Sequence, residues 1–181
     1  MKNTIAIFAG GFKPPTKGHF EVAKQALETY PEIKTLHVFI GGGIRDNINQ
    51  TQSLDIWNLY LKYLPKQIKI KKISGSPIKE VINIAKENPN TKVYLISGTR
   101  KGDVQGLIDY QNKLKLQNAY KNLEVKNITK DLDISGTKAR QTLNKSREEF
   151  FEYLPNELTS EDKIKVYNIL KPSLVESINH D

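Results

Sequence analysis

Near the start of the chain stands the sequence TIAIFAGGFKPPTKGHFEVAKQAL, residues 4–27. It opens with a nearly continuous apolar run, 4–9, of the kind found in a strand covered on both faces. It ends with Phe20, Ala23 and Leu27, which have the spacing of one apolar helix face. A loop rich in glycine and proline joins the two. The stretch therefore predicts a strand-loop-helix unit with its loop at the carboxyl end of a parallel strand.

The same alternation continues along the chain. Strand-like runs occur at 35–40 and 93–97, with weaker, more alternating runs typical of edge strands at 68–73 and 123–128. Segments with a helical period occur at 54–64, 78–85 and 103–116. The pattern predicts an α/β fold, a Rossmann-like doubly wound five-stranded parallel sheet in the order 3-2-1-4-5 with a helical C-terminal tail. In that order the loops after strands one and four face each other.

Composition limits the classes of protein that remain. The chain has 181 residues, 38% hydrophobic and 27% charged, which fits a single domain over residues 1–171 with a short tail at 172–181. It has no cysteine, which excludes disulfides, thiolate metal sites and a cysteine nucleophile. Its first apolar run is too short to span a membrane, so we expect no membrane partner and a cytoplasmic location. The net charge of +8 favours phosphate-rich partners.

The loop after the first predicted strand carries residues suited to phosphate. Gly10-Gly11 lets the backbone approach a phosphate closely, and Gly18-His19 opens a helix whose N–H groups attract anions. His19 can donate a hydrogen bond to a phosphate oxygen, while Lys13 and Lys17 add mobile positive charge. The loop lacks both the G-x-G-x-x-G fingerprint and the G-K-[ST] of a P-loop, which argues against dehydrogenases and P-loop enzymes.

Two stretches resemble the signatures of one enzyme superfamily. Thr16-Lys17-Gly18-His19, with Gly11-Phe12 upstream, resembles the (H/T)-x-G-H signature of the nucleotidyltransferases, the adenylyltransferases and cytidylyltransferases. The sequence ISGTKAR, 134–140, resembles their second signature, I-S-S-T-x-x-R, which follows the fifth strand and starts a helix. Together with the segment 45–60, the matches extend over 5–154. The S-G-T form is similar to that of archaeal-type nicotinamide-mononucleotide adenylyltransferases.

The resemblance implies an enzyme that transfers a nucleoside monophosphate, expected to be AMP from ATP, to a small phosphate-bearing acceptor and releases pyrophosphate. Nicotinamide mononucleotide is one acceptor that it suggests. A cytidylyltransferase acting on a phosphorylated alcohol or sugar, and a pantetheine-phosphate adenylyltransferase, stay open as alternatives. A nucleic-acid-binding module on the same fold is the rival from another class, against which the absence of an aromatic ribbon or basic run argues. Whether the chain forms a homo-oligomer is left open.

The loop positions and the resemblance together assign a site. The predicted catalytic residues are His19, Lys13 and Arg140. The predicted nucleotide-binding residues are Gly10, Gly11, Phe12, Thr16, Gly18, His19, Gly98, Arg100, Ile134, Ser135, Gly136, Thr137 and Arg140. The predicted acceptor-binding residues are Lys13, Gly41 and Arg45. Mg²⁺ is expected as cofactor, held by triphosphate oxygens and water rather than by protein ligands.

Other chemistry-bearing residues receive structural interpretations. Trp57, Tyr60 and Tyr63 are interpreted as core residues rather than base-stacking platforms, because they share a helical period with leucines. Asp103 is interpreted as a helix cap, and Asp131 and Asp133 as turn or helix-start residues. His37 and His180 have no spacing that suggests a metal site or a catalytic triad.

Overall fold

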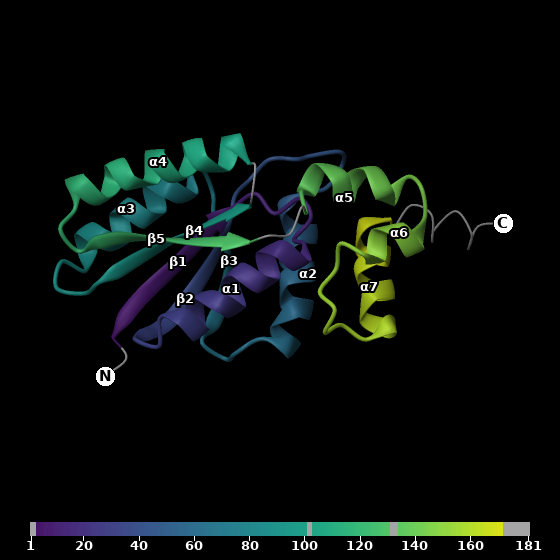
Figure 1. The fold of residues 1–181 in the computed structure, drawn as a ribbon, viewed down its shortest axis with the longest axis horizontal. Coiled ribbons are helices and arrows are strands. Elements are labelled where there is room, and N and C mark those ends of the chain that lie inside the picture. Colours follow the sequence, from purple (N-terminus) through teal and green to yellow (C-terminus); the bar gives the residue numbers. More distant parts are fainter. Residues whose placement is uncertain (1–2, 101–102, 131–133, 172–181) are drawn as a thin grey trace.

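The computed structural model describes residues 3–100, 103–130 and 134–171, with the side chains of Arg100 and Lys130 left out. Its centre is a five-stranded parallel sheet in the order β3-β2-β1-β4-β5 (Figure 1). The strands are β1 (Thr4–Gly10), β2 (Ile33–Ile40), β3 (Ile68–Lys72), β4 (Val93–Arg100) and β5 (Leu123–Lys130). The predicted strand order is confirmed, and the two weaker runs form the edge strands β3 and β5.

Helices cover both faces of the sheet (Figure 1). The helices of the strand-helix repeat are α1 (Lys17–Thr29), α2 (Gln50–Tyr60), α3 (Pro77–Glu87) and α4 (Val104–Ala119). Side chains of α1 and α2 belong to one apolar core, and side chains of α3 and α4 to a second. In β1, Ala6 and Phe8 join the first core while Ile7 joins the second. Burial on both faces explains why this strand is a continuous apolar run rather than an alternating one.

Three C-terminal helices extend the first core. They are α5 (Gly136–Leu143), α6 (Arg147–Phe151) and α7 (Ser160–Leu170). Phe150, Leu154 and Val166 are buried in the same core as α1 and α2. The predicted helical tail therefore packs on the sheet's helical layer through its apolar side chains.

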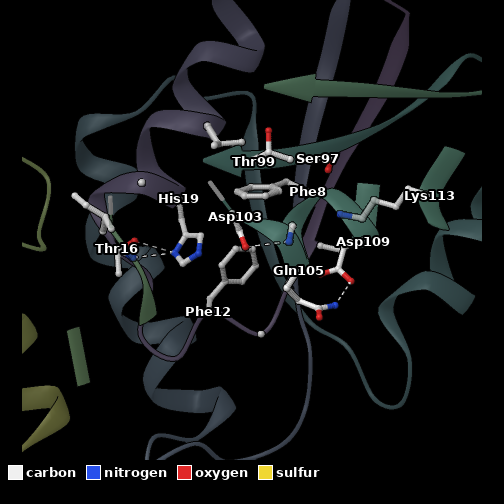
Figure 2. Close-up of a pocket in the computed structure, with 18 residues that line it drawn as sticks. Phe8, Phe12, Thr16, His19, Ser97, Thr99, Asp103, Gln105, Asp109 and Lys113 are labelled. Atoms are coloured by element: carbon white, nitrogen blue, oxygen red, sulfur yellow. Dashed lines mark hydrogen bonds between the residues drawn. The ribbon is translucent and has the colours of Figure 1, made fainter. Parts of the chain in front are cut away.

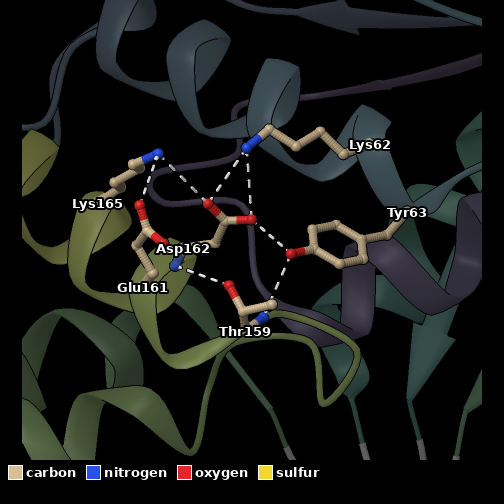
Figure 3. A network of polar contacts seen from close by, with 6 residues as sticks. All are labelled: Lys62, Tyr63, Thr159, Glu161, Asp162 and Lys165. Atoms are coloured by element: carbon tan, nitrogen blue, oxygen red, sulfur yellow. Dashed lines mark hydrogen bonds and ion pairs between the residues drawn. The ribbon is translucent and has the colours of Figure 1, made fainter.

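A polar network fastens α7 to the 3₁₀ turn, Leu61–Tyr63, that follows α2 (Figure 3). The buried carboxylate of Asp162 accepts hydrogen bonds from the Tyr63 hydroxyl and from Lys62 Nζ, the latter at 3.2 Å. Thr159 caps the start of α7 by accepting the Asp162 backbone N–H at 3.1 Å. The hydrogen bond from Tyr63 is the largest of the influences that hold the pKa of Asp162 below its ordinary value. The ionised carboxylate thus joins the start of α7 to the turn that follows α2.

The boundaries of two predicted helices differ from the structure. The apolar period around 54–64 predicts one helix, whereas α2 ends at Tyr60 and a 3₁₀ turn, Leu61–Tyr63, follows. Trp57 and Tyr60 are fully buried and Tyr63 packs against the same core, which confirms their interpretation as core residues. The fourth helix continues to Ala119.

Among the described residues, every helix falls short of the length and apolar character needed to cross a bilayer.

Candidate functional site

A cavity of about 360 Å³ opens where β1 and β4 end (Figure 2). This is the point at which the winding of the sheet reverses, and the loops after β1 and β4 face each other there, as the predicted strand order requires. Residues of β1 and β4, and of the loops and helices that follow these two strands, line the cavity. From β1, the first loop and α1 they are Phe8, Ala9, Gly10, Gly11, Phe12, Thr16, Gly18, His19 and Val22. From β4, the segment after it and α4 they are Ser97, Gly98, Thr99, Asp103, Gln105, Gly106, Asp109 and Lys113. Ile134 of the second predicted motif completes the wall.

His19 is held at the start of α1 by its own helix cap. Thr16 is the N-cap, and its backbone N–H donates to His19 Nδ1 at 3.0 Å. A ring nitrogen that accepts this bond carries no proton, so the neutral imidazole is protonated at Nε2. The edge-to-face contact with Phe12, 4.9 Å between ring centroids, limits rotation of the ring. His19 therefore lines the cavity with Nε2 as the ring nitrogen that carries the proton.

Phe12 has a structural role in the first loop that the sequence pattern did not predict. Its φ of 53° lies in the left-handed region, which is costly for a side-chain-bearing residue. The buried ring contacts Phe8 and Trp57, and its carbonyl accepts a hydrogen bond from Ser53 Oγ. A Cβ added at Gly10 would lie 3.0 Å from this ring. Gly10 is thus required by Phe12, whereas Gly11 faces open space.

Lys13 is buried rather than mobile. Its side chain is only 6% exposed, and its ammonium donates to the carbonyls of Gly11 and Gly41, the latter at 3.1 Å. Burial, with a smaller contribution from nearby Arg45, lowers the pKa of Lys13. The expectation of a flexible cation at Lys13 is therefore corrected, because carbonyls from two loops hold the ammonium. Lys17 begins α1, and its backbone N–H donates to Tyr153 O at 2.8 Å.

The second predicted motif starts α5 beside the first loop. Ser135 is the N-cap and its hydroxyl accepts the Lys138 N–H at 3.0 Å. Arg140 donates from Nη1 to the carbonyl of Lys13 and from Nε to Asp46, both at 2.7 Å. The structure thus brings the two motifs together through Arg140.

Space beside Arg140 is tight at the start of α5. A Cβ added at Gly136 would lie 3.0 Å from Arg140 Nη1, so a glycine fits there. Ser135, Gly136, Thr137 and Arg140 lie outside the cavity lining, which contains only Ile134 from this motif. Their predicted contacts with nucleotide stay predictions.

The segment after β4 confirms one structural interpretation. Asp103 is the N-cap of α4 and accepts the Gly106 N–H at 3.0 Å. Gly98 lies where a Cβ would approach Val22 to 3.0 Å, so α1 packs closely on this strand. Arg100 ends β4, but its side chain lies outside the described part of the chain, as do Asp131, Asp133 and His180.

The three residues predicted to bind the acceptor do not line a common cavity. Gly41 donates its backbone N–H to the Gly10 carbonyl at 2.8 Å and lines a second cavity. Arg45 is exposed in a turn closed by a bridge to Ile48, and it lines neither cavity. The structure therefore brings Lys13 and Gly41 into contact, and of the three predicted residues only Gly41 lines a cavity.

The second cavity, about 840 Å³, was not anticipated from the sequence. It lies between the ends of β1 and β2, the start of α3 and one side of α4, and five residues line both cavities: Ala9, Gly10, Gly11, Asp109 and Lys113. Its wall is mostly glycine and aliphatic side chains, with Asn112, Asp109 and Lys113 as the polar members. Neither Asp109 nor Lys113 was singled out from the sequence; their four-residue spacing on the predicted fourth helix is the signal that could have placed them on one face.

Comparison with known proteins finds similar solved structures, among them two of the same enzyme. Both are of Plasmodium falciparum nicotinic acid mononucleotide adenylyltransferase, one complexed with APC and the other with NaAD. The first has a TM-score of 0.63 and 18% identity, covering 92% of this chain and 98% of that chain. The second has a TM-score of 0.63 and 20% identity, covering 92% and 96%. No family model and no curated protein matches the sequence. At these identities the likeness establishes a common fold.

Proposed function

We propose that the protein is a nucleotidyltransferase that moves an adenylyl group from ATP to a phosphate-bearing acceptor and releases pyrophosphate. The observation that carries this proposal is the pair of cavities that meet at Gly10-Gly11, with His19 held as a donor in the first. Two cavities with a common wall suit a reaction between two bound molecules. The two signature-like motifs and the fold shared with an adenylyltransferase support the same reaction class.

In the proposed arrangement the nucleotide occupies the first cavity and the acceptor the second. An oxygen of the acceptor's phosphate attacks the α-phosphorus, the new O–P bond forms, and the bond from that phosphorus to the bridging oxygen of pyrophosphate breaks. The acceptor's phosphate is already ionised near neutral pH, so no strong general base is needed. His19 donates a hydrogen bond to a phosphate oxygen whose charge grows during transfer, which stabilises the transition state.

Arg140 is proposed to bind the outer phosphates. Its Nε, Nη1 and Nη2 each donate one hydrogen bond within the protein, to Asp46, Lys13 and Thr137. A guanidinium has five N–H groups, so two remain after these three among the described contacts. These two can bind phosphate oxygens while the other three keep the group in place.

Mg²⁺ is part of the proposal as a companion of the triphosphate. Among the described residues there is no group of three or more histidine, cysteine or carboxylate side chains that would hold a metal ion by itself. Asp103 and Asp109 line the first cavity, and their carboxylates can accept hydrogen bonds from the water shell of an ion held by phosphates. Bound there, the ion would neutralise part of the triphosphate's charge.

The test is a pyrophosphate-release screen that pairs each nucleoside triphosphate with each acceptor in the presence of Mg²⁺. Nicotinamide and nicotinic acid mononucleotides come first, followed by phosphopantetheine, flavin mononucleotide and phosphorylated sugars and alcohols. We expect release with ATP and one acceptor, dependent on both. A His19→Glu variant measured in parallel shows whether the release belongs to this site. Release only with CTP would reject adenylyl transfer, and no release with any pair would reject the proposed function.

A further inference from the structure

Lys113 occupies a position that the predicted site did not include. It lies on α4 and lines both cavities, at the wall where they meet. Figure 2 shows its side chain extending from α4 beside Asp109, among the residues that line the first cavity. The opposite side of that cavity is formed by Phe12 and His19. Lys113 therefore brings a positive charge to the boundary between the two spaces.

The ammonium of Lys113 has no hydrogen bond and no ion pair with any residue that the structure describes. Asp109, one turn earlier on the same helix, acts on it only through a longer-range charge interaction. Burial lowers the pKa of Lys113, and Asp109 opposes that shift. The protein thus places a partly desolvated cation in a cavity without satisfying it.

Other cations near the cavities are engaged differently. Lys13 donates to two backbone carbonyls, and Arg140 pairs with Asp46 and a third carbonyl. Both hold loops in place. Removing an ammonium group from water without giving it a partner costs free energy. An anion that enters the cavity offsets this cost by pairing with the ammonium. A perturbed, unsatisfied ionisable group in a cleft is a feature typical of ligand sites.

We propose that Lys113 binds the acceptor's phosphate at the junction of the two cavities and so places it for attack. The inference rests on the proposed function, because that reaction is what brings a phosphate to this wall. The ammonium donates hydrogen bonds to the phosphate oxygens that do not attack. It keeps its protons throughout, while the attacking oxygen forms the new bond to the α-phosphorus. Two anions must approach each other in this reaction, and a cation between them reduces their repulsion.

A chemical-modification experiment tests the binding without requiring turnover. The wild-type protein is acetylated with a limiting amine-reactive reagent, and the rate at each lysine is followed by peptide mass spectrometry. Inorganic orthophosphate is the probe, with sodium chloride at equal ionic strength as the control. We expect orthophosphate to slow the modification of Lys113 several-fold. It should leave Lys115, an exposed lysine on the same helix, unchanged. Equal rates at Lys113 with and without orthophosphate would overturn the proposal.

Substitutions then link the site to the reaction. With the acceptor found in the screen, Lys113→Met should raise the KM for the acceptor about tenfold or more while changing the KM for ATP much less. Lys113→Arg should recover much of the loss, and Lys115→Met should behave as wild type. An unchanged acceptor KM in Lys113→Met would overturn the role of Lys113 and leave the proposed function standing. If no substrate pair releases pyrophosphate, the proposed function fails, and orthophosphate protection still decides whether Lys113 binds phosphate.

Discussion

Replacing His19 should separate helix capping from catalysis. In the structure the imidazole does two things: Nδ1 accepts the Thr16 N–H, and the ring packs edge-on against Phe12. Loss of the cap bond typically costs ~1 kcal/mol, and an aromatic pair contributes ~1 kcal/mol. His19→Ala should therefore lose ~2 kcal/mol of unfolding free energy, which lowers the Tm of a chain of this size by roughly 4–8 °C.

Glutamate and glutamine are informative alternatives at position 19. It is the third residue of α1, where Glu and Gln normally reach back to the N-cap N–H. Both variants should keep the cap and lose only the ring contact, so that their Tm lies between those of wild type and His19→Ala. The two variants differ in hydrogen-bond donation, the property that we expect to matter for adenylyl transfer. Glutamine can still donate a hydrogen bond toward the cavity, whereas glutamate cannot.

We expect kcat to depend on whether the side chain at position 19 can donate a hydrogen bond, and not on the thermal stability of the variant. A preorganised donor to developing charge is typically worth roughly 10²–10³ in kcat, so His19→Glu and His19→Ala should lose that factor and His19→Gln less. Thermal unfolding, ATP binding by calorimetry and pyrophosphate release would be measured on the same preparations. A stable His19→Glu variant with near-normal kcat would refute the reasoning, since it would show that this side chain serves only as a helix cap.

Three further outcomes test separate parts of the structure. Arg140→Ala should weaken ATP binding roughly tenfold or more beyond its effect on AMP binding, because charged hydrogen bonds to the outer phosphates are lost; equal losses in calorimetry would remove that role. Gly10→Ala should lower the unfolding free energy by ~1–3 kcal/mol, because its methyl group meets the Phe12 ring, whereas Gly11→Ala should leave the Tm nearly unchanged. Asp162→Asn should lower the Tm near pH 7. Because the folded-state pKa of Asp162 is depressed, that difference should shrink as the pH falls below about 4, which thermal melts at several pH values would show.

The strand order could be predicted because its causes are local. Buried parallel strands such as β1 must be apolar on both faces, and edge strands such as β3 need only one apolar face. The handedness of crossovers then leaves few arrangements. The end of α2 could not be found in this way, because the 3₁₀ turn after Tyr60 keeps nearly the same apolar spacing as the helix. The hydroxyl of Tyr60 donates to the carbonyl of Pro15, a contact that sequence spacing does not reveal.

The position of the first cavity followed from topology, but the contacts of individual cations did not. Lys13 was expected to add mobile positive charge to the first loop. Its ammonium is instead fixed partly by the carbonyl of Gly41, which comes from another strand. Arg140 meets Asp46 across an even longer separation in the chain. Such contacts depend on how loops converge after folding, which a periodic pattern does not encode.

Lys13 is buried and the side chain of Arg140 is nearly so. Both hold loops in place and still keep their positive charge. The side chain of Arg140 is 14% exposed while its partner Asp46 is 74% exposed, so water screens the acid more than the base. The pair therefore orients the guanidinium without cancelling its field at the start of α5. Lys13, bonded to neutral carbonyls, likewise keeps its full charge when protonated. Contacts that hold the loops rigid thus leave the positive potential in place, which is the condition that a site for two phosphate-bearing substrates requires.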